Sequence, residues 1–243
     1  MKNPFNITQL KREIKSFGAP AYDKGKVKVQ HRKMFGQVDE YFNKYFWVGE
    51  ITVPIFLIGG DLWMSLTPME IQSMWVPLKM AHGHVGTGGL GIGYFALRAA
   101  QKPEVESVTV YETSRHAIQY FKDVYKDRDG FDKIKIVNKD VRNEKDKYFD
   151  LFFMDIYPTM LPNEVLTDRE EFCARNDVSL YRFWGEEKVY LTALIEDKVR
   201  SPHMEDLRLF KMWNEEHRQH GDISCLYDEF EDYDFVERVL EAS

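Results

Sequence analysis

Residues 80–100, MAHGHVGTGGLGIGYFALRAA, place six glycines between a short apolar run and a segment of helical character. Within this stretch, Gly86-Thr87-Gly88-Gly89-Leu90-Gly91 satisfies the pattern GxGxxG. In a strand–turn–helix unit, the first two glycines of the pattern permit positive φ angles and a close approach of the backbone to a ligand, and the third lets the helix pack against the strand. We therefore expect Gly86, Thr87, Gly88 and Gly91 to line a ligand that contains a nucleoside.

From residue 80 onward the chain alternates between strand-like and helix-like segments. MAHGHV, SVTVYE, KIKIVNKD and YFDLFFMDIYP predict strands, and GIGYFALRAAQ and SRHAIQYFKDVY predict helices. This alternation is typical of an α/β fold with a Rossmann-like parallel sheet. Beyond Pro158 the pattern weakens to helices at NEVLTDREEFCAR and GEEKVYLTALIEDKV and a strand at DVSLYRFWG. The sequence therefore leaves open whether the sheet ends after its fourth strand.

Carboxylates end three of the expected strands. Glu112 closes VTVYE, 21 residues after Gly91, where a carboxylate can bind both ribose hydroxyls of an adenosine-containing ligand. Asp140 ends the next strand, where it could receive an adenine amino group, and an ordinary turn aspartate is the alternative. Asp155 ends a strongly apolar strand, and such ends face the ligand crevice of a parallel sheet. We expect Asp155, followed closely by Tyr157, to have a functional role.

A short β-rich region precedes the glycines. Residues 45–66 are rich in aromatic and β-branched residues and predict strands, with turns at Gly49-Glu50 and Gly59-Gly60-Asp61. The sequence then opens a helix. Thr67 has the position of an N-cap, and Glu70 has the spacing of a capping box. Contact between Glu70 and a ligand is the less favoured alternative. The tryptophans at 63, 75, 184 and 213 are expected in the core.

The charge of the chain is unevenly distributed. Its net charge is −7, but residues 1–44 hold ten Lys and Arg against four Asp and Glu, and residues 201–243 hold twelve Asp and Glu against four Arg and Lys. The overall acidity does not indicate a nucleic-acid binder. We expect the domain organisation to be a solvated basic arm (1–44), a small β-rich region (45–69), a Rossmann-like domain (70–200) and a helical acidic extension (201–243), with binding of an acidic partner to the arm as the alternative.

Composition also bears on the compartment. Cys173 and Cys225 form no disulfide framework, the N-terminus lacks the apolar core of a signal peptide, and the longest apolar run is far too short to span a bilayer. These features predict a cytoplasmic protein with no membrane partner. His217 and His220 have helical spacing beside Glu216, but a metal site needs three or four convergent ligands, so we expect no metal.

The segment from about Gly59 to Pro158, roughly 100 of 243 residues, resembles the class I S-adenosylmethionine (SAM)-dependent methyltransferase superfamily, and within it the spermidine synthase-like (aminopropyltransferase-like) proteins. The motifs that carry the resemblance are IFLIGGDLWMSLTPMEIQS, GTGGLGIG, VTVYETS, KDV and FDLFFMDIYP. The resemblance implies SAM as cofactor, with the methionine part at Gly86, Gly88 and Gly91. It further implies that Glu112 holds the ribose, that Asp140 and Val141 frame the adenine, and that Asp155 lies beside the reacting sulfonium.

The sequence also departs from these families. Methyltransferases usually carry an acidic residue two positions before the first glycine of the turn, where this chain has His84, which we expect to be a core residue. Spermidine synthases carry a second aspartate where this chain has Pro158. A methyltransferase acting on a small-molecule or otherwise unidentified acceptor, with Asp155 and Tyr157 as catalytic residues, is therefore the leading hypothesis. An aminopropyltransferase, a non-catalytic nucleoside-binding module and an NAD-dependent dehydrogenase are the alternatives, and a homodimer is left open.

Overall fold

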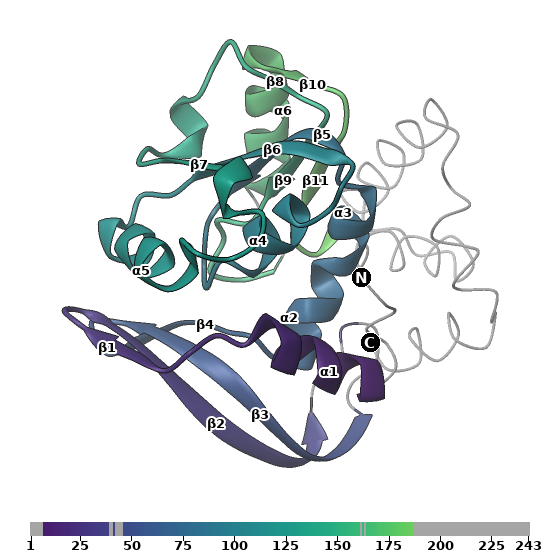
Figure 1. Ribbon diagram of the computed structural model, residues 1–243. Coiled ribbons are helices and arrows are strands. Elements are labelled where there is room, and N and C mark those ends of the chain that lie inside the picture. Colours follow the sequence, from purple (N-terminus) through teal and green to yellow (C-terminus); the bar gives the residue numbers. More distant parts are fainter. Residues whose placement is uncertain (1–6, 39–40, 42–45, 161, 163, 187–243) are drawn as a thin grey trace, which may run out of the picture.

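The computed structural model describes residues 7–38, 41, 46–160, 162 and 164–186 (Figure 1). Within these residues an antiparallel sheet and a parallel sheet are joined by helices that lie between and beside them. The helices expected at residues 187–200 and 201–243 lie outside the described residues, and so do Trp213, His217, His220 and Cys225.

The parallel sheet has five strands in the order β11-β9-β5-β6-β7. Their bounds are β5 (Gly83–Gly88), β6 (Val105–Tyr111), β7 (Ile134–Val137), β9 (Leu151–Met154) and β11 (Tyr181–Phe183). All four neighbouring pairs are parallel. The strand order reverses between β5 and β9, which is where ligands bind in open α/β sheets. The fold class expected from the sequence is confirmed, and β11 shows that the sheet continues beyond its fourth strand.

Helices cover both faces of this sheet. α4 (Tyr94–Ala100) and α5 (Arg115–Tyr125) lie on the face toward the antiparallel sheet, and α6 (Val165–Arg175) lies on the other face (Figure 1). Successive side chains of β9 point to opposite faces, as strand geometry requires. Phe152 stacks against Phe172 of α6 with ring centroids 4.1 Å apart, and Phe153 packs on Phe95 of α4 at 4.6 Å. This burial on both sides explains why β9 is apolar throughout.

The antiparallel sheet has the order β1-β2-β3-β4. Its strands are β1 (Tyr22–Lys24), β2 (Val27–Val38), β3 (Phe46–Ile58) and β4 (Asp61–Ser65). β2, which precedes the expected boundary at residue 44, pairs along its whole length with β3, which follows that boundary. Within the expected basic arm, residues 22–24 and 27–38 form β1 and β2 of this sheet, and Val27 and Val29 are buried there.

One of the two expected turns is wrong. Gly59 and Gly60, at φ 66° and 98°, join β3 to β4 as predicted. Gly49 has a positive φ of 67°, but it lies within β3, opposite Gly36, where the register shifts at a β-bulge. The glycine at position 49 therefore accommodates an irregularity in a long strand pair instead of reversing the chain.

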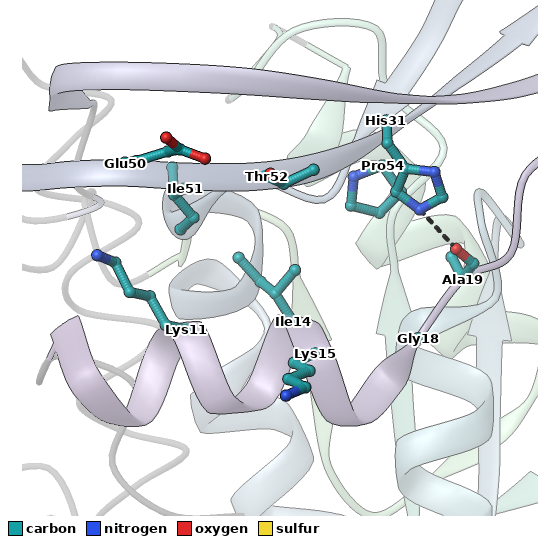
Figure 2. Close-up of a pocket in the computed structure, with 10 residues that line it drawn as sticks. All are labelled: Lys11, Ile14, Lys15, Gly18, Ala19, His31, Glu50, Ile51, Thr52 and Pro54. Carbon is teal, nitrogen blue, oxygen red and sulfur yellow. Dashed lines mark hydrogen bonds between the residues drawn. The ribbon is translucent and has the colours of Figure 1, made fainter.

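α1 (Ile7–Phe17) links the two sheets. Glu13 accepts hydrogen bonds from the Tyr94 hydroxyl at 2.9 Å and from Arg98 Nε at 2.7 Å, both on α4. A cavity of about 370 Å³ lies between α1 and the β2–β3 pair (Figure 2). There the His31 ring is held 2.8 Å from the Ala19 carbonyl oxygen, so the polar groups of this cavity serve the local structure.

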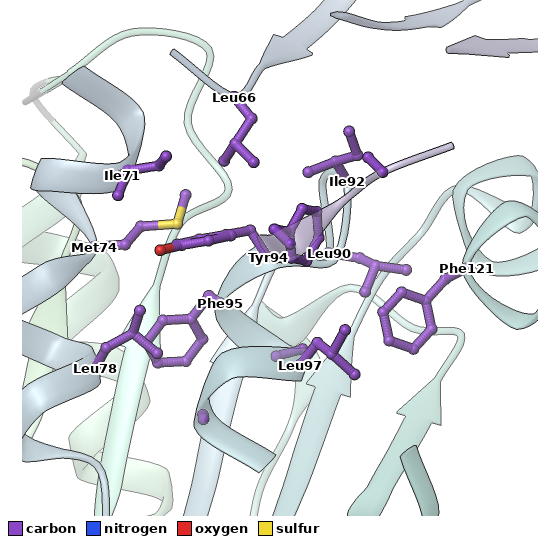
Figure 3. Close-up of a cluster of buried hydrophobic side chains, with 14 of the residues drawn as sticks. Leu66, Ile71, Met74, Leu78, Leu90, Ile92, Tyr94, Phe95, Leu97 and Phe121 are labelled. Carbon is purple, nitrogen blue, oxygen red and sulfur yellow. The ribbon is translucent and has the colours of Figure 1, made fainter. Parts of the chain in front are cut away.

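α2 (Pro68–Ser73) and α3 (Trp75–Met80) lead from the antiparallel sheet into β5. Figure 3 shows their apolar side chains meeting those of the glycine turn and α4. Trp75 is buried and Trp184 is half-buried, but Trp63 is 52% exposed on the edge strand β4, so its expected core position is wrong. No helix in the described ranges has the length and apolarity needed to cross a bilayer. The buried cluster of Figure 3 is formed by Leu66, Ile71, Met74, Leu78, Leu90, Ile92, Tyr94, Phe95, Leu97 and Phe121.

Candidate functional site

The glycine turn is built three residues later than the GxGxxG pattern suggests. β5 runs through Gly88, and the left-handed backbone angles occur at Gly89, Gly91 and Gly93, with φ of 89°, 52° and 87°. Each of these glycines is tightly enclosed. A Cβ on Gly89 would lie 2.1 Å from the Asp155 carbonyl oxygen, and one on Gly93 would lie 2.3 Å from the Phe121 ring. The turn that carries the chain from β5 into α4 is therefore Gly89–Gly93.

Gly86 and Gly88 are strand residues, so the positive φ expected at these two positions is wrong. A Cβ on Gly86 would lie 2.4 Å from the Phe152 ring, and one on Gly88 would lie 2.8 Å from Met154 Sδ. Gly86 is thus required by close packing between β5 and the neighbouring strand β9. Thr87 lies between them, fully buried, with its hydroxyl 3.5 Å from the Gly88 carbonyl.

Glu112 directly follows β6 and is bound to the glycine turn. Its Oε2 accepts a hydrogen bond from the Leu90 N–H at 3.0 Å, and its Oε1 accepts one from the Ser114 N–H at 2.7 Å. The side chain is buried. Because each carboxylate oxygen has a second lone pair, both oxygens can still accept a hydrogen bond from a ligand hydroxyl. The strand-end position expected for this carboxylate is therefore realised beside the glycine turn.

Asp140 and Val141 follow β7. Asp140 caps the short 3-10 helix η2 (Val141–Asn143) by accepting a hydrogen bond from the Arg142 N–H at 3.0 Å, which is the role of an ordinary turn aspartate. Val141 is buried, and its Cγ1 lies 3.1 Å from the position of a Cβ on Gly88. The end of β7 thus reaches the end of β5, and Val141 supplies an apolar surface next to the turn.

Asp155 lies where the sheet order reverses. Its N–H donates to the Gly88 carbonyl at 2.9 Å, so the residue is aligned with the end of β5 and touches the glycine turn. Its carboxyl group has no hydrogen-bond or ion-pair partner among the described residues. Burial raises the pKa of this carboxyl to about 7. An unpaired carboxyl at the switch point of a parallel sheet is a candidate reactive group.

Glu70 was expected from the sequence to complete a capping box with Thr67 at the start of α2. Thr67 Oγ1 does accept the Glu70 N–H at 3.4 Å, as predicted. The reciprocal bond of a capping box is missing, because the Thr67 N–H donates to the Ser65 carbonyl instead. Burial first and the nearby Asp155 carboxylate second raise the pKa of Glu70 to about 8. The capping-box prediction is therefore wrong for the Glu70 side chain, although its N–H is capped by Thr67.

Tyr157 is held by α6. It is buried, and its hydroxyl donates to Asp168 Oδ2 at 2.9 Å, while Arg142 binds both oxygens of the same aspartate at 2.9 Å. Burial and then the Asp168 carboxylate raise the pKa of Tyr157 well above its ordinary value. The hydroxyl is therefore a fixed hydrogen-bond donor within this network.

His84 lies at the opposite end of β5, so it does not take part in the turn. Its side chain is 48% exposed, with Nδ1 2.9 Å from Ser107 Oγ and Nε2 3.6 Å from Glu106. The core position expected for His84 is therefore wrong. Counted from Gly89, the first glycine of the turn as built, the residue two positions earlier is Thr87.

Met64 was not identified from the sequence. It lies at the end of β4, and its thioether sulfur accepts a hydrogen bond from the Ile92 N–H at 2.9 Å. A Cβ on Gly91 would lie 2.3 Å from the same sulfur. The antiparallel sheet thus contacts the glycine turn directly. No sequence signal marks this contact, because a methionine in a strand normally indicates only packing.

Metal ligands are not gathered here. In the part of the chain that the structure describes, no group of three or more His, Cys, Asp or Glu side chains has a geometry that could hold a metal ion. The polar groups that meet at the glycine turn are carboxyls and backbone amides, which suit an organic ligand with hydroxyl groups and a positive charge.

Comparison with known proteins gives distant structural similarities alone. No protein-family profile and no curated protein matches the chain. Among solved structures, it is similar to the 23S rRNA methyltransferase ErmE, with 18% identity over 42% of this chain and 40% of that one and a TM-score of 0.33. It is also similar to a putative RNA methyltransferase from Pyrococcus horikoshii, with 19% identity over 46% of this chain and 57% of that one and a TM-score of 0.34. An rRNA methylase from Streptococcus thermophilus has 14% identity over 56% of this chain and 81% of that one, with a TM-score of 0.36.

The fold is Rossmann-like. This chain spans 40% and 57% of the first two proteins named, which is less than two thirds of either. Identities below 20% and TM-scores below 0.4 are too low to carry an argument about this chain. What the chain binds and does must therefore be inferred from the residues at the end of its sheet.

Proposed function

We propose that this protein is a SAM-dependent methyltransferase. The observation that carries the proposal is the meeting of four strand ends around one glycine turn. Gly89–Gly93 follows the central strand β5, Glu112 follows β6, Val141 follows β7 and Asp155 follows β9. The pyrophosphate or amino-acid part of a nucleotide cofactor binds at such a turn when the next strand ends in a carboxylate.

The residues present fit this cofactor. Glu112 offers two carboxylate oxygens with free acceptor capacity to a ribose diol. Val141 offers a buried apolar surface to an adenine ring. Asp155, unpaired and partly charged near neutral pH, is compatible with a positively charged sulfonium. When bound, SAM supplies an electrophilic methyl carbon that is transferred by in-line displacement.

The protein's own contribution is alignment, exclusion of water and proton transfer. The buried side chains of the turn and α4 belong to the apolar core beside the site. Holding donor and acceptor in line lowers the barrier without further covalent chemistry. The Asp155 carboxylate accepts the proton that the acceptor loses, and its pKa near 7 is suited to that role at neutral pH. Tyr157 is assigned to the wall of the acceptor pocket, oriented by Asp168.

The acceptor class is not assigned by these groups. The proteins named above carry rRNA or RNA in their names, and the four-stranded sheet includes a strand, β2, with Lys28, Arg32 and Lys33 exposed. RNA therefore belongs in the acceptor screen beside small molecules, although the net charge of −7 gives no support to a general nucleic-acid binder.

An aminopropyltransferase using decarboxylated SAM is the second candidate. It is favoured by the antiparallel sheet that precedes the parallel sheet and contacts the glycine turn through Met64, as the β-rich lead-in of the spermidine synthase-like resemblance implies. It is disfavoured by Pro158, which replaces a carboxylate that would grip a polyamine.

Calorimetric titration of the full chain with SAM, S-adenosylhomocysteine, decarboxylated SAM, methylthioadenosine and NAD tests the proposal. We expect binding of SAM and S-adenosylhomocysteine, and a loss of at least tenfold in affinity in Glu112→Ala, in line with the removal of a buried charged hydrogen-bond acceptor. Tighter binding of decarboxylated SAM would favour the second candidate. Binding of NAD alone, or of none of the five, would refute the methyltransferase proposal.

A further inference from the structure

Asp168 is a carboxylate shared by two segments of the chain that follow different strands. It lies in the first turn of α6, and its side chain is 10% exposed. From the segment after β7, Arg142 donates through Nε to Oδ1 and through Nη2 to Oδ2, both at 2.9 Å. From the segment after β9, the Tyr157 hydroxyl donates to the same Oδ2 at 2.9 Å. Three charge-assisted hydrogen bonds therefore meet at one carboxylate.

The arginine directly follows the valine beside the glycine turn. Val141 and Arg142 both belong to η2, but their side chains have different partners. Val141 is buried, with Cγ1 3.1 Å from the position of a Cβ on Gly88 at the end of β5, whereas Arg142 binds α6. η2 is a single turn of 3-10 helix, whose hydrogen bonds have poorer geometry than those of an α-helix. The place of Val141 next to Gly88 therefore depends on the contacts that η2 makes with other elements.

The segment that carries η2 is fastened at both ends. At its start, Asn138 Nδ2 donates to the Glu112 carbonyl at 2.8 Å, which ties the segment to the end of β6. Further on, the Asp146 N–H donates to the carbonyl of the last residue of α6 at 2.9 Å. Between these two points, the bidentate ion pair holds η2 to the first turn of the same helix. The forked geometry of such a pair fixes direction as well as distance.

We propose that Asp168 is a positioning residue for the cofactor site. By binding Arg142, it holds Val141 at the end of β5 before the cofactor arrives, and by binding Tyr157 it holds the segment after β9 to the same helix. The proposal rests on the function proposed above, in which Val141 lies against the adenine ring. A site whose residues are already ordered binds its ligand more tightly, because less conformational freedom is lost on binding. Asp168 acts through its two neighbours rather than by contact with the cofactor.

The first test needs no cofactor. Amide hydrogen exchange in the full chain reports how often η2 opens. The Asn143 and Glu144 N–H groups donate to the Asp140 and Val141 carbonyls, at 3.0 Å each. In Asp168→Asn we expect these two amides to exchange about tenfold faster or more, because fewer contacts must break for η2 to open, while the amides of β5 and β6 keep their rates. Equal exchange at the two amides in Asp168→Asn and the wild type would overturn the proposal.

Further variants separate the ion pair from a general effect on α6. Arg142→Gln removes the other partner, whose side chain is 42% exposed, and should speed exchange at the same amides. Arg142→Gln decides the test if Asp168→Asn fails to fold. Glu171→Gln removes a 60% exposed acid that pairs with Arg175 within α6 at 3.6 Å, so this variant should match the wild type. Asp168→Glu keeps the negative charge and should restore part of the protection.

The second test measures the cofactor site, at a temperature at which every variant is fully folded. Calorimetric titration with S-adenosylhomocysteine should show about tenfold weaker binding to Asp168→Asn and to Arg142→Gln, in line with the loss of a charge-assisted bidentate bond. The double variant should bind no more weakly than the weaker single variant, because both substitutions remove the same interaction. Asp168→Glu should bind more tightly than Asp168→Asn, and Glu171→Gln should match the wild type.

The two failures are distinguishable. Faster exchange in Asp168→Asn and Arg142→Gln, without binding of SAM or S-adenosylhomocysteine to the wild type, would support the ordering of η2 by Asp168 and refute the methyltransferase. Binding of S-adenosylhomocysteine with equal affinity in Asp168→Asn and the wild type, or with losses that add in the double variant, would retain the cofactor and refute positioning by Asp168.

Discussion

Asp155 is half-buried, and its carboxyl has no partner among the described residues, a combination that costs stability. A carboxyl whose pKa rises on folding binds its proton more tightly in the folded state, so stability present below its unfolded pKa is lost as the pH rises through the folded pKa. For Asp155 the pKa rises from 3.8 to about 7, and this residue therefore destabilises the fold increasingly between pH 4 and 7. A residue that lowers the stability of the fold in this way at the end of a sheet is typical of a functional site.

We expect Asp155→Asn to be more stable than the wild type above neutral pH. A displacement of about three pH units sets an upper bound of ~4 kcal/mol at pH 8, which solvent screening of the half-buried carboxyl reduces, and the difference should shrink toward pH 4. Urea unfolding at pH 5, 6.5 and 8 measures it. The asparagine side chain can also change the free energy of unfolding by an amount that does not depend on pH. The quantity to compare is therefore the change with pH of the stability difference between Asp155→Asn and the wild type. A difference that does not grow with pH would contradict the burial of an ionisable Asp155.

Glu112 has a structural task in addition to the one proposed with cofactor. It satisfies two backbone N–H groups, on Leu90 and Ser114, that would otherwise be left without an acceptor. We expect Glu112→Ala to lower the free energy of unfolding by about 2–3 kcal/mol in the absence of ligand, because an unsatisfied buried donor carries its full desolvation cost. Glu112→Gln keeps one acceptor oxygen and should lose less. Equal stability of Glu112→Ala and the wild type would mean that these bonds do not persist in solution.

Among the secondary-structure elements, the glycine turn is the most constrained. Gly93 has a φ of 87°, and a Cβ there would meet the Phe121 ring of α5 at 2.3 Å. Gly25, in the turn between β1 and β2, has a φ of 62° and nothing within 4 Å of the same position. A substitution at Gly25 therefore tests backbone strain alone, whereas one at Gly93 tests backbone strain together with a steric clash.

We expect Gly25→Ala to cost about 1 kcal/mol from backbone strain alone and Gly93→Ala to cost at least 2 kcal/mol more. Thermal and urea unfolding of the two variants give the comparison. If both substitutions cost the same, α5 would have to move away from the turn without penalty, and the tight packing of Figure 3 would be in question.

At the level of the whole molecule, the two sheets share one core. Val27, Val29 and Phe56 of the antiparallel sheet belong to the same buried cluster as Val85 and Val108 of the parallel sheet. The Phe56 and Tyr120 rings lie 5.0 Å apart across the boundary. The antiparallel sheet is therefore packed against the Rossmann-like part as a continuation of its core.

A shared core predicts a single cooperative unfolding transition. Fluorescence of the tryptophans and far-ultraviolet circular dichroism should give coincident urea midpoints. Glu13→Ala, which removes the acceptor of Tyr94 and Arg98 between α1 and α4, should shift both midpoints together, by about 1–3 kcal/mol. A separate early transition in either probe would show that the antiparallel sheet unfolds on its own.

Much of the architecture follows from local pattern. The alternation of apolar strands and amphipathic helices predicts the parallel sheet, and Ser114 and Thr67 cap α5 and α2 as side-chain oxygen acceptors do at helix starts. Glu112 and Asp155 end strands, and all parallel strands of one sheet end at the same edge. Their meeting was therefore predictable without any knowledge of tertiary contacts.

Other features depend on which residues the folded chain brings together. The sequence predicted the glycine turn at Gly86–Gly91, but Gly86 packs on Phe152 within the sheet and the left-handed glycines lie at Gly89, Gly91 and Gly93. Glu70 has the spacing of a capping box, yet the Thr67 N–H donates to the Ser65 carbonyl instead, and Trp184, 111 residues after Ser73, binds the end of α2. Periodicity and capping depend on neighbours along the chain and can be read locally, whereas the contacts of Trp184 with Ser73 and of Gly86 with Phe152 join distant residues that no local pattern links.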